Sequence, residues 1–126
     1  MSAYILELPN LPYPSLNTRR SKLYDGASIK DWREAAGWAA RAANVPALES
    51  PTVRLHFYPG DNRRRDAVNL ALVHKAAVDG VVDAGVLADD DPDHVVEMMP
   101  AIHKGTGKRR WELHVTPALT DAEVRW

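Results

Sequence analysis

Three features of this 126-residue sequence predict an α+β fold. Short stretches in which apolar and polar residues alternate mark strands near the start, in the middle and near the end of the chain. Two longer stretches between them repeat apolar residues at helical spacing. Proline and glycine separate these elements, and their order, β-α-β-α-β-β, predicts one domain with a small mixed four-stranded sheet and two main helices. Because strand-to-helix crossovers are right-handed, both helices should cover one face of the sheet if the paired strands keep the same direction.

The first predicted element is a strand over residues 4–8, where apolar and polar side chains alternate. Pro9, Pro12 and Pro14 exclude helix from the loop that follows. This loop should extend to about Gly26, so that the first helix begins after it.

The start of the first helix is predicted at Ser28, because Asp31 follows three residues later as in a capping box. It should end near Asn44, since Pro46 disfavours helical geometry in the residue before it. The apolar stripe that this helix should bury consists of Ile29, Trp32, Ala36, Ala39 and Ala43.

The middle of the chain reads as a strand, a turn and a second helix. Val53, Leu55 and Phe57 alternate with polar residues and predict the strand. Helical spacing from Asn69 to Ala84 predicts the helix, with the following glycine as its C-cap. Residues 95–103 and 111–116 then predict two strands joined as a hairpin, and residues 120–123 predict a short final helix.

Composition restricts the classes of function. Cysteine is absent, which excludes thiolate catalysis and cysteine-ligated zinc and fits a reducing compartment. No apolar stretch approaches membrane-spanning length, and the first eight residues lack the features of a signal peptide. We therefore expect a soluble protein of the cytoplasm that does not contact a membrane.

The formal net charge of −1 conceals three basic clusters, each in a predicted connection between elements. They comprise Arg19, Arg20 and Lys22; Arg63, Arg64 and Arg65; and Lys104, Lys108, Arg109 and Arg110. Any one of them alone is better explained as a solvated loop, but loops at one edge of a sheet can converge on a polyanion such as nucleic acid. The phosphate contacts are expected from Arg63, Arg64, Arg65, Asn69, Lys104, Lys108 and Arg109.

Carboxylates accompany these cations. Asp66 directly follows the second basic cluster, and Asp89, Asp90 and Asp91 form an acidic run after the second helix. Carboxylates can hold the divalent cation that phosphodiester hydrolysis usually needs. Taken singly, each has an ordinary explanation: Asp66 as a helix cap, the acidic run as a solvated loop, and Lys75 as an exposed ion pair with the aspartate four residues later.

The residues of this central region resemble the RusA-like Holliday junction resolvases, a family common in phages and prophages. The resemblance is carried by Arg64, Arg65, Asp66, Asn69, Leu70, Lys75, Ala76, Ala77, Asp79, Gly80, Asp83, Ala84, Gly85, Leu87, Asp89 and Asp90. Leu8, Pro9, Pro14 and Asn17 look like the amino-terminal segment of the family. The likeness extends from Tyr4 to about Pro117.

The resemblance implies a homodimeric, Mg²⁺-dependent endonuclease that resolves four-way DNA junctions by paired nicks in recombination and repair. It also implies that Asp66 and Asp90 are catalytic carboxylates and that Lys75 is the catalytic lysine. Mg²⁺ would then be held by Asp66 together with Asp89 and Asp90.

One residue departs from the family pattern. The pattern has a second aspartate two residues after the first, where this chain has Val68, and an aliphatic group cannot ligate a hard cation. Asp61, Asn69, Asp91 or water could replace the missing ligand. The alternative function is therefore a junction-binding protein whose catalysis is impaired.

The length of the second predicted helix bears on whether one chain or two chains form the site. A helix over residues 69–84, at about 1.5 Å per residue, separates Asp66 from the acidic run by roughly 24 Å. Either the acidic run folds back along the helix, or it completes the site of a second subunit. Ala76, Ala77 and Gly80 give the second possibility modest support as small residues that a neighbour could approach closely, although packing within the chain explains them equally well.

Zinc is not expected from the sequence. The histidines show no compact ligand spacing, and packing in the core or at the surface explains them better. They stand at His56, His74, His94, His103 and His114.

Overall fold

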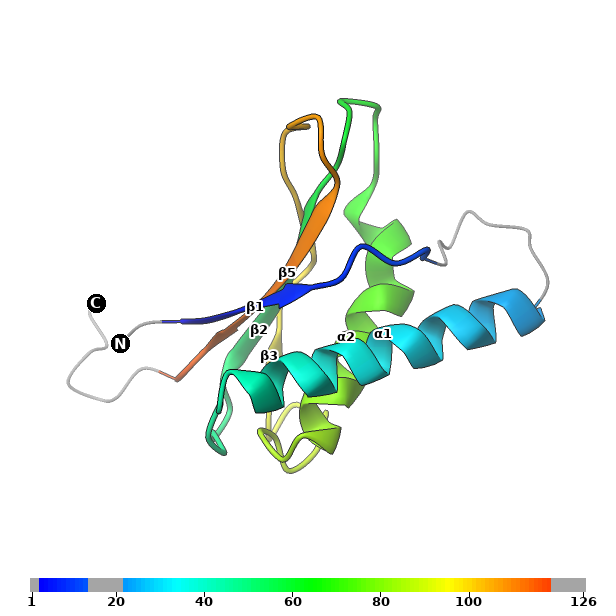
Figure 1. The fold of residues 1–126 in the computed structure, drawn as a ribbon. Coiled ribbons are helices and arrows are strands. Elements are labelled where there is room, and N and C mark those ends of the chain that lie inside the picture. The colour runs from blue at the N-terminus through cyan, green and yellow to red at the C-terminus, as the bar shows by residue number, and fades with distance from the viewer. Residues whose placement is uncertain (1–2, 14–21, 119–126) are drawn as a thin grey trace, which may run out of the picture.

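The computed structural model describes residues 3–13 and 22–118, with the side chains of 3–13 and 29–118. In these ranges the chain is α+β, with a mixed five-stranded sheet and two α-helices (Figure 1). The elements are β1 (Tyr4–Leu8), α1 (Lys22–Ala42), β2 (Thr52–Tyr58), the 3₁₀ helix η1 (Ala67–Leu70), α2 (Ala71–Asp83), β3 (Val96–Glu97), β4 (Ala101–Ile102) and β5 (Arg110–Thr116). The predicted class is confirmed, and the predicted final helix lies outside the described residues.

The sheet order is β1-β5-β2-β3, with β4 also paired to β2. β5 is antiparallel to both β1 and β2, whereas β3 and β4 run parallel to β2. The predicted hairpin between the last strands is therefore wrong, because β2 lies between them. Apolar alternation indicates which residues form strands but leaves their partners open, and consecutive strands are not always neighbours.

The third predicted strand is divided in two. Val96 lies opposite Thr52, whereas Ala101 lies opposite His56, so the stretch between β3 and β4 is one residue longer than the facing part of β2. Such an extra residue forms a bulge, and Pro100, which has no N–H to donate, lies within it. Four strands were predicted and five are found for this reason.

One face of the sheet forms the core. The side chains that point to this face are Leu6 and Leu8 from β1, Val53, Leu55 and Phe57 from β2, and Trp111, Leu113 and Val115 from β5. Trp32 of α1 packs edge-on against Trp111 at 4.8 Å, and Val73 and Val81 of α2 are fully buried in the same cluster. Both helices therefore cover one face, as predicted, and the opposite face carries the polar residues of each strand (Figure 1).

The two helices cross in close contact at paired glycines. A Cβ atom on Gly80 would overlap the carbonyl oxygen of Arg33 and lie 2.9 Å from the Gly37 nitrogen. Nearby, Arg33 donates two hydrogen bonds to the Asp83 carboxylate, at 2.6 and 2.8 Å. The neighbour that approaches Gly80 is thus α1 of the same chain.

This packing overturns one argument for the dimer. Ala76 and Ala77 have no exposed surface in the single chain, and Gly80 is buried as well. The small residues of α2 are therefore explained by packing within the chain and cannot face a second subunit in this arrangement.

The helix ends differ in how well they match prediction. α1 begins at Lys22, six residues before the predicted start, because Gly26 and Ser28 are weak helix formers that lower helix stability without breaking it. Ala43, which was predicted to belong to the buried stripe of this helix, is exposed. Ala40 is buried instead.

α2 is preceded by η1 and ends as predicted. Gly85 has a φ of 82°, and its N–H bonds to the Val82 carbonyl at 2.9 Å. The N–H of Val86 bonds to the Val81 carbonyl at 3.2 Å, which completes a Schellman motif. The chain is turned back at this point, and this reversal sets the position of the acidic run.

Candidate nucleic-acid interface and acidic cluster

Two basic loops lie side by side beyond the end of the sheet (Figure 1). The first follows β2 and the second precedes β5. The N–H groups of Thr106 and Gly107 donate to the carbonyls of Pro59 and Gly60, each at 3.2 Å, and the N–H of Gly105 donates to the Asn62 side chain at 2.7 Å. The predicted convergence is confirmed for the second and third clusters, whereas Arg19 and Arg20 of the first lie outside the described residues.

Asp61 organises the first loop. Its carboxylate accepts hydrogen bonds from the Arg63 backbone N–H at 3.0 Å and from the Arg65 guanidinium at 2.9 Å, and these contacts lower the pKa of Asp61. The Arg65 side chain is 18% exposed and lies over the Phe57 ring. Arg63 and Arg65 therefore hold the loop in shape, and Asp61 is not free to replace the carboxylate absent at Val68.

The other predicted phosphate contacts fall into two groups. Arg109 donates to the Asn10 side chain at 2.6 Å and lies over the Tyr13 ring, so it anchors the second loop to the segment after β1. Arg64, Lys104 and Lys108 are exposed, and none of them forms an ion pair within the described ranges. These three are cations that the loops present to solvent without an ion pair, and the Arg63 side chain, although paired with Asp61, is 78% exposed as well.

Asp66 lies beside the arginines of the first loop in a pocket of about 240 Å³. The pocket is lined by Tyr13, Arg63, Arg64, Arg65, Asp66, Asn69, Leu70 and Ile102. Asp66 occupies the N-cap position of η1, but its side chain makes no capping hydrogen bond. Capping therefore does not explain this aspartate, and its carboxylate is exposed at the mouth of the basic surface.

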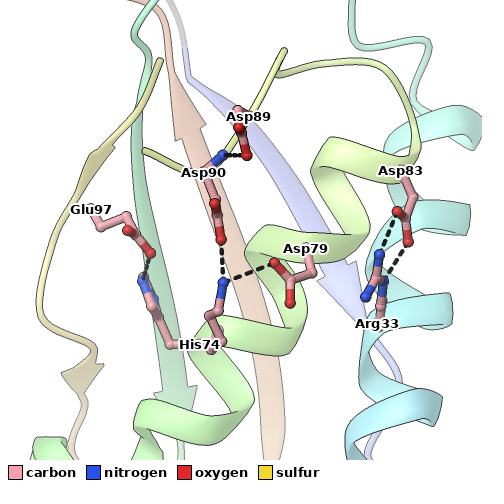
Figure 2. Close-up of polar contacts among 8 residues, drawn as sticks. Arg33, His74, Asp79, Asp83, Asp89, Asp90 and Glu97 are labelled. Atoms are coloured by element: carbon pink, nitrogen blue, oxygen red, sulfur yellow. Dashed lines mark hydrogen bonds and ion pairs between the residues drawn. The ribbon is translucent and has the colours of Figure 1, made fainter. Parts of the chain in front are cut away.

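Lys75, Asp79 and Asp90 form a separate cluster. The Lys75 ammonium donates hydrogen bonds to the Asp90 carboxylate and to the Asp79 carboxylate, the latter at 3.1 Å. Figure 2 shows that Asp79 and Asp90 point toward each other from α2 and from the acidic run. Hydrogen bonds to Asp90 and then Asp79 raise the pKa of Lys75, and the bond from Lys75 lowers the pKa of Asp90. Asp79 was not predicted as a site residue; its spacing of four from Lys75 was the available signal.

The rest of the acidic run has local partners. Asp89 accepts a hydrogen bond from the Asp90 N–H at 2.8 Å, and Figure 2 shows the two side by side. The Asp91 carboxylate accepts from the Asp93 N–H at 3.0 Å and contacts the His94 ring at 2.7 Å. Asp91 is therefore turned away from the cluster and does not supply the missing carboxylate.

The two loci lie at different levels of α2. The acidic run does fold back, since Asp90 reaches Lys75. Lys75 is nevertheless nine positions after Asp66, which corresponds to roughly 15 Å along η1 and α2 at about 2.0 and 1.5 Å per residue. Within the described part of the chain, no group of three or more His, Asp or Glu residues is arranged to hold a metal ion. A single chain thus does not assemble the magnesium site expected from Asp66, Asp89 and Asp90.

Comparison with known proteins adds no assignment. No known protein family matches the chain, and no curated protein matches it. Among the described residues, neither helix combines the length and apolar character that crossing a membrane requires.

Proposed function

We propose that the protein is a Mg²⁺-dependent endonuclease that acts as a homodimer on four-way DNA junctions, in cytoplasmic recombination and repair. The observation that carries the proposal is the position of Asp66, an uncapped carboxylate in a pocket lined by the arginines of the first basic loop, which lies against the second. A polyanion drawn to these loops would present its phosphates to that carboxylate.

The loops would grip the DNA backbone without reading bases. Arg64, Lys104 and Lys108 would contact phosphates directly, while Arg63, Arg65 and Arg109 keep the loops in place. Such contacts suit recognition of branch shape more than recognition of sequence.

Each catalytic site would be composed of residues from two subunits. Within one chain, the described residues gather no group of carboxylates that could hold an ion, whereas a two-fold axis can bring Asp66 of one subunit beside Asp89 and Asp90 of the other. When bound, Mg²⁺ would polarise the scissile phosphate and lower the pKa of water. Lys75, whose pKa is raised by hydrogen bonds to Asp90 and Asp79, would stabilise negative charge on the leaving oxygen.

A labelled four-way junction tests this proposal. The wild-type protein should bind the junction without Mg²⁺ and introduce symmetric nicks once Mg²⁺ is added. Asp66→Asn should bind equally well and fail to cut, because it retains the basic loops and lacks one ligand. Wild-type protein that neither binds nor cuts the junction would refute the proposed function.

A second candidate is a protein that binds junctions without cutting them. Val68, at the position of the expected carboxylate, is 49% exposed and leaves the Asp66 locus short of one oxygen ligand. Under this alternative, the wild type binds and does not nick. Val68→Asp would then gain Mg²⁺-dependent nicking, because it restores the ligand.

A further inference from the structure

Three histidines gather on the polar face of the sheet, away from both loci described above. His56 lies on β2, His114 on β5, and His103 directly follows β4. The rings of His56 and His114 stack at 3.7 Å, and His103 stacks on Tyr58 at 4.1 Å. Strand pairing creates this group, which is why sequence spacing gave no sign of it.

Two of these rings direct nitrogen atoms at each other. Nδ1 of His56 lies 2.8 Å from Nε2 of His103, and the ring planes are inclined by only 24°. The ring centroids are 5.0 Å apart, so the rings meet edge to edge in nearly one plane. A hydrogen bond here requires one ring to donate and the other to accept.

The neighbouring polar groups are already occupied. The Glu112 carboxylate accepts from the Tyr58 hydroxyl and contacts His114 Nε2, each at 3.0 Å, and it accepts from Arg110 at 2.8 Å. Arg54 donates to the Met99 carbonyl at 2.9 Å. In the part of the chain that the structure describes, Glu112 is therefore engaged by other groups and makes no hydrogen bond to the His56 and His103 pair.

We propose that His56 and His103 bind a divalent transition-metal ion of the Zn²⁺ class, with water completing its coordination. Imidazole nitrogen is a preferred ligand of such ions, at about 2.0–2.1 Å. Two such bonds at angles between a right angle and a tetrahedral angle place the nitrogens roughly 2.8–3.4 Å apart. The pair needs to open by up to about half an ångström, and each ring needs to turn by roughly 35–45° so that its lone pair points at the ion and not at the other nitrogen.

The protonation state favours metal binding at neutral pH. Burial, together with the nearby His114, His103 and Arg54, lowers the pKa of His56 to about 4, and burial also lowers the pKa of His103. Both rings are thus neutral at pH 7, and a metal ion needs only a change of tautomer, without net proton release.

Binding at this position would link β2 to the base of the second basic loop, since Lys104 follows His103 directly. It does not depend on the proposed nuclease activity. Mg²⁺ should not replace Zn²⁺ there, because Mg²⁺ prefers oxygen ligands.

Calorimetric titration of the wild-type protein with ZnCl₂ at pH 7 tests the proposal. We expect one site, which His103→Gln weakens by roughly 10–100-fold, as loss of a ligand should do at least as much as loss of a supporting group. His94→Gln serves as the matched control, because His94 lies beside Asp91 away from this face. It should leave the site intact, and titration with MgCl₂ should show no binding at it.

Spectra of the wild type address the same question without a variant that could fail to fold. Zn²⁺ should shift the imidazole resonances of His56 and His103 and leave those of His74 in place. Equal Zn²⁺ binding by wild type and His103→Gln, or shifts confined to His94, would overturn the proposal.

Discussion

Single side chains in this protein owe their charge states to residues far away in sequence. The hydrogen bond to Asp90, fifteen positions later, raises the pKa of Lys75, and burial, with His114 and His103 beside it, lowers the pKa of His56. The charged residues of the basic loops could be identified from sequence. Their division into Arg63 and Arg65, which shape the loop around Asp61, and Arg64, which does not, depends on loop geometry that spacing does not specify.

Acid should destabilise the protein through His56. Its pKa is about 4 in the folded chain and near 6.5 when unfolded, so between these values the unfolded chain binds a proton that the folded chain does not. The free energy of unfolding should therefore fall as pH decreases from about 6.5 to 4. Urea unfolding in metal-free buffer across this range should show a shallower fall for His56→Gln than for wild type.

His94 provides the contrasting case. Asp91 raises the pKa of His94, so its contribution is present below about 6.5 and is lost as pH rises through the folded pKa. His94→Gln should not reduce the fall in the free energy of unfolding between about pH 6.5 and 4. The same pH dependence in wild type and His56→Gln would show that His56 is not the group responsible.

At the scale of elements, the strands were predictable and their pairing was not. The alternation in β1, β2 and β5 identified the strands because one face of each is buried. β3 and β4 are too short to carry a clear alternation, and the placement of β2 beside β5 depends on contacts between distant residues. The start of α1 was missed because local capping signals do not exclude an earlier start.

The crossing of α1 and α2 gives the sharpest prediction at this scale. Gly80→Ala places a methyl group against the Arg33 carbonyl and within 2.9 Å of Ala36, so the helices must separate. We expect the free energy of unfolding to drop by about 1–3 kcal/mol, despite the better helix propensity of alanine. Chemical denaturation followed by circular dichroism measures this directly.

Gly60→Ala is the matched control. The nearest atom to its added Cβ is 3.8 Å away, an ordinary contact, and stability should change by less than about 0.5 kcal/mol. If Gly80→Ala were as stable as Gly60→Ala, the close contact between the helices would not exist in solution.

At the scale of the whole molecule, the fold separates the basic loops, which we propose bind DNA, from the acidic cluster around Lys75. The basic loops and Asp66 lie at one end of the η1 and α2 region, while Asp90 lies at the level of Lys75. The sequence indicated both groups of residues and offered either a folded-back run or a second subunit. In the structure the acidic run folds back as far as Lys75, but Asp66 remains at a separate locus. The proposed function therefore depends on a dimer.

Salt dependence should report the phosphate contacts of the loops. For each of Arg64, Lys104 and Lys108, substitution by Gln should reduce the slope of log binding constant against log salt concentration by about 0.9, as one phosphate contact is lost. Fluorescence anisotropy with a four-way junction measures the slope. Lys30→Gln, on the exposed surface of α1, is the control and should leave it unchanged; unchanged slopes for all three loop variants would place the DNA elsewhere.

The most direct test of the composite site is complementation between two inactive variants. Asp66→Asn and Asp90→Asn should each bind a four-way junction and fail to nick it with Mg²⁺. Mixed and refolded together, they should form heterodimers in which one of the two sites has all its carboxylates, and single nicks should reappear. If verified heterodimers stay inactive while the wild type cuts, the carboxylates do not come from two subunits and the account of the site is contradicted.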